Sequence, residues 1–71
     1  MITLKLIGWQ RGLQTVSLIS AICEHSGISL PQAKAKVEDL LAGQVVTIEF
    51  SEMEKMKAFR QEATGMGAKC E

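Results

Sequence analysis

The sequence predicts an α+β fold, a two-layer sandwich in which three helices cover one face of a three-stranded, mainly antiparallel sheet. Three observations lead to this prediction. Two segments alternate apolar and polar residues with the period of a strand, and three others carry apolar residues at helical spacing. Glycines and helix-capping residues separate these segments. The predicted order is β-α-α-β-α-β, and 71 residues are enough for a single domain, residues 1–71.

The first strand is expected over residues 1–8, where Ile2, Leu4 and Leu6 share one face. Residues 8–12, with glycines at both ends, then form a turn. Trp9 in this turn is the only tryptophan. Two roles stay open for it: a lid over one end of the core, or an exposed anchor for a partner.

The first helix is expected over residues 13–26, and its apolar arc is unusually broad. One flank of the arc carries Leu18 and Ile22, and the other carries Val16, Ile19 and Cys23. A two-layer domain needs a narrower apolar stripe from one helix. We therefore expect one flank to face the core and the other to stay partly exposed. The alternative is that the whole arc is core.

The second helix has both of its ends encoded in residues 27–43. Ser29 and Gln32 form a capping box, Pro31 suits the first turn, and Gly43 can take a left-handed conformation after the last turn. Lys34 lies on the outer, charged face. The predicted apolar stripe consists of Leu30, Ala33, Val37, Leu40 and Leu41.

The second half of the chain repeats these patterns. A strand over residues 44–50 points Val46, Ile48 and Phe50 inward. A second capping box, Ser51–Glu54, is expected to open the third helix, which would end at Gly65. The apolar stripe of that helix is Met53, Met56, Phe59 and Ala63. A last short strand over residues 67–71 would turn Ala68 and Cys70 inward.

Composition argues against several classes of function. The formal net charge is zero, whereas a nucleic-acid binder needs an excess of Lys and Arg and a polybasic membrane anchor needs the same. No apolar run approaches the roughly 20 residues of a membrane span, and the first residues alternate like a strand, not like a leader. We expect a cytoplasmic protein that binds neither nucleic acid nor membrane.

The sequence also lacks the side-chain groups that catalysis needs, so we expect no enzyme, no cofactor and no metal site. Glu38 and Asp39 are adjacent on a helix and diverge by about 100°. His25 has no nucleophile or ligand cluster at useful spacing, and its place near a helix end suits the helix dipole. The spacing of Cys23 and Cys70 fits no zinc pattern, so both are expected to be reduced, half-buried thiols.

Several of these segments together resemble the C-terminal domain of the bacterial ribosomal stalk protein of the large subunit. The resemblance rests on the initial strand ITLKL, the segment GISLPQAKAKVED and the run SEMEKMKAFRQEATGMGAKCE, and it covers almost the whole chain. Its most specific part is the pattern Gly-x-x-Leu-x-x-Ala-Lys-x-x-Val-Glu, which begins at Gly27. The resemblance implies the β-α-α-β-α-β fold described above.

The resemblance also implies a function in translation, because that family recruits translational GTPases through the first helix and the start of the second. It implies a non-enzymatic module that binds a partner protein, possible partners including a translational GTPase. Basic residues of the family's first helix are replaced here by Thr15, Ser20 and Cys23. The predicted protein-binding residues are Val16, Ile19, Ser20, Cys23 and Lys34.

Two alternatives remain open. The adaptor that delivers N-degron substrates to the Clp protease is similar in fold, which suggests a peptide-binding adaptor that uses a sheet edge or a groove beside Trp9. That family carries an Asn-Asp-Asp segment where this chain has residues 8–11, GWQR, and a histidine on the second helix that this chain lacks. The other alternative is a homodimer that buries the apolar flank of the first helix.

Overall fold

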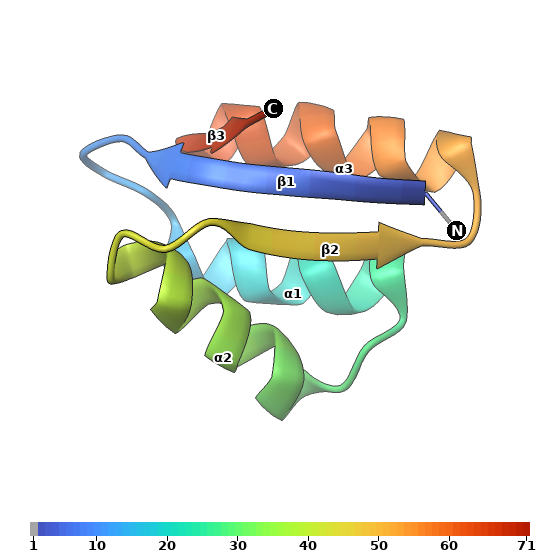
Figure 1. Ribbon diagram of the computed structural model, residues 1–71, viewed down its shortest axis with the longest axis horizontal. Coiled ribbons are helices and arrows are strands. Elements are labelled where there is room, and N and C mark those ends of the chain that lie inside the picture. The colour runs from blue at the N-terminus through green and yellow to red at the C-terminus, as the bar shows by residue number, and fades with distance from the viewer. Residues whose placement is uncertain (1) are drawn as a thin grey trace.

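The computed structural model describes residues 2–71 and has the predicted order of elements. In chain order the elements are β1 (Ile2–Trp9), α1 (Thr15–Ser26), α2 (Leu30–Leu41), β2 (Val46–Phe50), α3 (Met53–Met66) and β3 (Ala68–Cys70). Figure 1 shows β1 and β2 in front, α1 and α3 behind them, and α2 next to β2. Among the described residues, no helix combines the length and the apolar character needed to cross a membrane.

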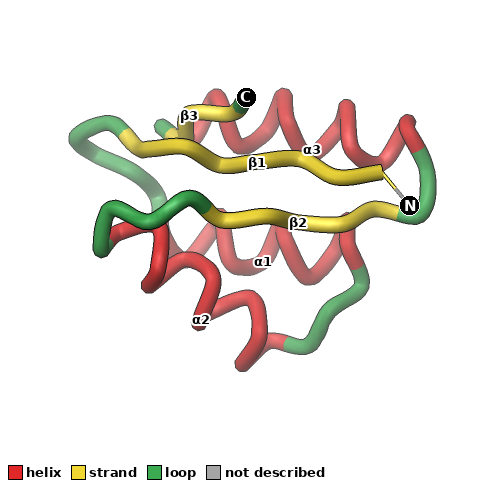
Figure 2. The backbone as a smooth tube through the Cα atoms, viewed as in Figure 1, coloured by secondary structure: helices red, strands yellow, loops and turns green. Residues whose placement is uncertain are grey.

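The sheet has the order β2-β1-β3, and both strand pairs are antiparallel (Figure 2). β1 and β2 pair without interruption, from Ile2 opposite Phe50 to Leu6 opposite Val46. The pairing of β1 with β3 is irregular, with a β-bulge between Leu6 and Gly8. This three-stranded sheet with three helices confirms the predicted α+β class.

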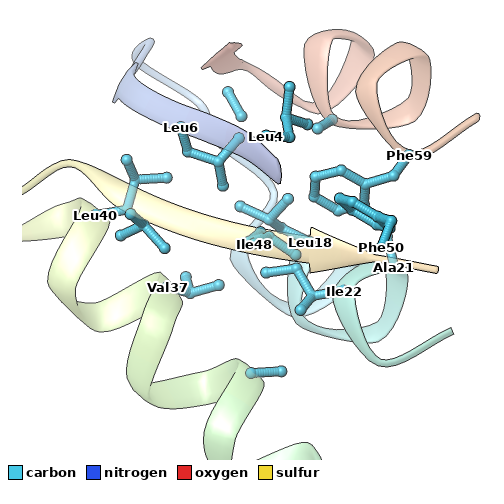
Figure 3. Close-up of a cluster of buried hydrophobic side chains, with 14 residues drawn as sticks. Leu4, Leu6, Leu18, Ala21, Ile22, Val37, Leu40, Ile48, Phe50 and Phe59 are labelled. Carbon is cyan, nitrogen blue, oxygen red and sulfur yellow. The ribbon is translucent and has the colours of Figure 1, made fainter. Parts of the chain in front are cut away.

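The core lies between the sheet and the helices, and its largest side chains are aromatic (Figure 3). The rings of Phe50 and Phe59 pack with their centroids 5.4 Å apart, which joins β2 to α3. Leu4 and Leu6 of β1 are buried as predicted. The buried residues are Leu4, Leu6, Leu18, Ala21, Ile22, Ala33, Val37, Leu40, Val46, Ile48, Phe50, Phe59, Ala63 and Ala68.

The ends of α2 follow the sequence prediction. The backbone N–H of Gln32 donates to Ser29 Oγ at 3.4 Å, and the N–H of Ser29 donates to Gln32 Oε1 at 3.3 Å. This capping box satisfies backbone groups that a helix start leaves unpaired. After the last turn, Gly43 has a φ of 91°, the left-handed conformation expected there.

The predicted ends of the third helix are wrong. No side chain forms a cap at Ser51–Glu54; α3 begins at Met53 and follows Glu52, because the chain needs residues 51–52 to turn away from β2. At the other end, Gly65 lies inside the helix. Gly67 ends it with a φ of 104°, since glycine reaches this conformation without a Cβ clash.

The predicted helix stripes are too broad, because Leu30, Leu41 and Met53 are exposed. At about 100° per residue, Leu30 and Leu41 lie about 60–80° from Ala33, at the margin of the buried stripe. Met53 is the first residue of α3 and lies beyond the end of the core. These apolar side chains therefore add to the surface of the domain.

Other boundaries moved by one or two residues. The first helix begins at Thr15 and not at residue 13, because Leu13 belongs to the preceding turn, where its N–H donates to Gln10 O at 3.2 Å. The second strand begins at Val46 and not at residue 44. The last strand is limited to Ala68–Cys70.

Candidate protein-binding site

Four of the predicted binding residues lie along one flank of α1, at the helical spacing of three and four residues. Val16 is 76% exposed, and Ser20 is exposed as well. Ile19 and Cys23 are half-buried and pack against the core. The opposite flank, which carries Leu18 and other core residues, is buried. The expected division of the apolar arc into a core flank and a partly exposed flank is thus present.

The fifth predicted residue, Lys34, is exposed on α2, a helix that packs beside α1. Leu30 stands one turn before Lys34 and is 61% exposed. From the sequence, Leu30 was expected in the core and was not among the predicted protein-binding residues. The apolar stripe of α2 is asymmetric about Ala33, because it extends farther around the helix on the side of Lys34. This asymmetry could have indicated that Leu30 lies at the exposed margin of the stripe.

Trp9 lies at the end of β1 and is 41% exposed. The β-bulge explains its position: Leu6 pairs with Cys70 and Gly8 pairs with Lys69, so Ile7 is an extra residue in β1. Trp9 then falls opposite the buried Ala68, on the side of the sheet that the helices cover. Trp9 is not among the side chains of residues 2–71 that pack against the buried core, and its ring is accessible to solvent.

A groove that the sequence analysis did not find lies along the free edge of β2. It encloses about 400 Å³ and is lined by Ser26, Ile28, Lys36, Thr47, Ile48 and Glu49. A second hollow of about 380 Å³ adjoins it on α2, since both share Ile28 and Lys36. The sequence could not reveal this groove, because it shows neither which strand is at an edge nor where α2 crosses.

The backbone of β2 presents hydrogen-bonding groups to this groove. The carbonyl of Lys5 accepts a hydrogen bond from the N–H of Glu71 at 2.9 Å, so the backbone groups of Lys5 face away from β2. In an antiparallel ladder, when the backbone N–H and C=O of one residue point away from the partner strand, those of the residue opposite point away from the first strand. That residue is Thr47, and Glu49 follows with the same orientation. Accordingly, Lys36 Nζ donates to the carbonyl of Thr47 at 2.9 Å.

The histidine and the cysteines lie in structural surroundings. His25 in the last turn of α1 pairs with Glu62 of α3 and packs edge-on against Phe59. Both cysteines are free and half-buried, as predicted. Burial raises the pKa of the Cys70 thiol, although a hydrogen bond from Thr64 and the charge of Arg60 act in the opposite direction.

Within residues 2–71, no group of His, Cys, Asp or Glu side chains is arranged to hold a metal ion. No protein-family model matches the chain, and no curated protein matches it in sequence. The resemblance to the ribosomal stalk domain therefore stays a prediction from the residues themselves.

Proposed function

We propose that this protein is a non-enzymatic protein-binding module that holds a partner through the exposed flank of α1. The supporting observation is the exposure of Val16, at 76%, next to the half-buried Ile19 and Cys23. Together these side chains form an apolar strip of the kind that proteins use to bind partners. Ser20 and Lys34 supply polar groups around it, as at the rim of a protein interface. By the resemblance, a translational GTPase is one candidate partner.

Val16 is the best position at which to test this proposal. Ile19 packs against the core, so a charge there would threaten the fold, whereas the exposed Val16 can be changed without that risk. We expect Val16→Asp to weaken partner binding about fivefold or more, since a central apolar contact contributes more than about 1 kcal/mol and 1.4 kcal/mol is a factor of ten.

The experiment captures partners from source-cell lysate on immobilised wild type and Val16→Asp, identifies them by mass spectrometry, and then titrates the purified partner. Met53→Asp is the matched control: Met53 is exposed as well, and an acidic residue is tolerated in the first turn of α3. Equal binding by wild type and Val16→Asp would contradict the proposal.

Sedimentation of the same proteins separates partner binding from self-association. If Val16→Asp only converts a wild-type dimer into monomers, the α1 flank joins two copies of this chain. The resemblance would then concern the fold alone. If the wild type is monomeric and its binding to the purified partner is lost in Val16→Asp, α1 is the binding surface.

A further inference from the structure

We propose that the free edge of β2 is a second binding site, independent of α1, which takes an extended segment of a partner polypeptide as an added strand and favours a segment that carries a carboxylate. The site consists of the backbone groups of Thr47 and Glu49 and the groove beside them. Binding of this kind combines main-chain hydrogen bonds with pockets for alternate side chains.

The free edge of β2 carries backbone groups that no other strand of the described sheet pairs. Thr47 and Glu49 each direct one N–H and one C=O outward, because the residues opposite them in β1 face β3. Within residues 2–71, the one hydrogen bond to these groups comes from Lys36. An edge of this kind is a ready template for another strand.

The shape of the groove beside β2 also bears on the binding of an added strand. α2 approaches β2 through Lys36 and leaves about 400 Å³ between the strand edge and the loop that joins α1 to α2. Ile28 is half-buried and supplies an apolar wall, while Ile48 is buried behind it, so a side chain of an added strand that points to the helix side can pack beside Ile28. The other side chains would extend the open face of the sheet beside Thr47 and Glu49, both of which are exposed.

A second copy of this chain fits the groove less well than a flexible segment does. In any copy, Lys36 ties α2 to the edge of β2, and Figure 1 shows α2 next to that edge. Two copies that joined their β2 strands would bring both α2 helices into the same space. An extended segment has no such helix beside it.

The preference for a carboxylate follows from Lys36. An added strand would donate its own N–H to the carbonyl of Thr47, where it competes with the Lys36 ammonium for that oxygen. Asp39 and Glu49 line the two hollows, but neither forms an ion pair with Lys36 in the described residues. A carboxylate on the segment would give the released ammonium a charged hydrogen-bond partner.

The test uses the full chain, labelled with ¹⁵N, and short synthetic peptides as probes. Each probe is a Val/Thr pentapeptide with blocked ends and a single Glu at one position, and each has a Gln twin; a further pair compares a free with an amidated C-terminus. The Glu/Gln pairs test a side-chain carboxylate, and the last pair tests a terminal one. Backbone amide signals report where and how tightly each peptide binds.

We expect binding at about the millimolar level, which corresponds to about −4 kcal/mol. The amides of Thr47 and Glu49 should shift most, while those of Val46 and Ile48, which face β1, should shift less. At least one acidic peptide should bind about threefold more tightly than its neutral twin, because exposed ion pairs contribute about 0.2–1 kcal/mol. Lys36→Met should remove this difference between acidic and neutral peptides.

Several outcomes would overturn the proposal. The site is wrong if no peptide shifts the Thr47 and Glu49 amides, or if the shifts fall on α1. The carboxylate preference is wrong if acidic and neutral peptides bind wild type equally. Amides of Thr47 and Glu49 that shift with protein concentration, without peptide, would instead show that a second copy occupies the edge. Val16→Asp should leave peptide binding unchanged, which keeps this test separate from that of α1.

Discussion

The β3 edge and the β2 edge of the sheet manage their unpaired backbone groups in different ways. β3 has three residues, and a β-bulge interrupts its pairing with β1. Short strands and bulges are two devices by which proteins prevent further pairing at an edge. β2 has five residues in regular register and contains neither proline nor a bulge. On this side the side chain of Lys36 binds one of the edge carbonyls, that of Thr47.

The packing of the helices also differs between the β3 edge and the β2 edge. On the β3 side, α3 contributes Phe59 to the core and holds α1 through the pair of His25 and Glu62. On the β2 side, α2 leaves Leu30 and Leu41 exposed and a groove open against the strand. Both sides contribute buried side chains to the core, and on the β2 side a groove also lies against the edge strand.

The largest expected effect comes from Phe59→Ala, which removes a fully buried aromatic ring that packs against Phe50. It should lower the free energy of unfolding by about 3–5 kcal/mol, a large part of the roughly 5–15 kcal/mol of a typical domain. Leu30→Ala is the control on the α2 side and should cost less than about 0.5 kcal/mol. Chemical denaturation measures both, and similar losses at the two positions would contradict the comparison.

An intermediate effect is expected at the turn that leads into β3. Gly67→Ala would place a Cβ 3.3 Å from Leu13 Cα at a φ of 104°, and such strain costs about 1–3 kcal/mol. Gly65→Ala, two residues earlier and inside α3 with open space around it, should instead stabilise by about 0.5–1 kcal/mol. Thermal unfolding of the two variants should therefore shift in opposite directions. If both raise the melting temperature, the turn does not need glycine.

The smallest effect concerns Cys70, at the end of β3. Because burial raises the pKa of this thiol in the folded protein, the unfolded chain loses the proton first as pH rises. The stabilisation is therefore complete below the usual thiol pKa of about 8.5 and is lost as pH rises above it. Denaturation under reducing conditions at neutral and alkaline pH should show a steeper loss for wild type than for Cys70→Ala. Identical slopes for wild type and Cys70→Ala would contradict the prediction.

Local patterns in the sequence were sufficient for much of the fold. Alternation in β1 and β2 identified the inward residues, and the capping box of Ser29 and Gln32 located the start of α2. The ends of α3 were less well predicted, because both Ser51 and Gly65 carry local signals that the chain does not use. The ends of α3 depend on how the chain passes from β2 to β3, and local residue types do not specify that path.

For the candidate sites, the sequence by itself determined that α1 has more apolar surface than one core needs, since helical periodicity places Val16 on the side away from Leu18. Only the tertiary structure decided which strand is an edge, because strand order depends on how distant segments pair. It also decided that Lys36 reaches Thr47 and that Leu30 stays exposed. These features depend on where α2 packs against the sheet, a placement set by the whole core and not by any one segment.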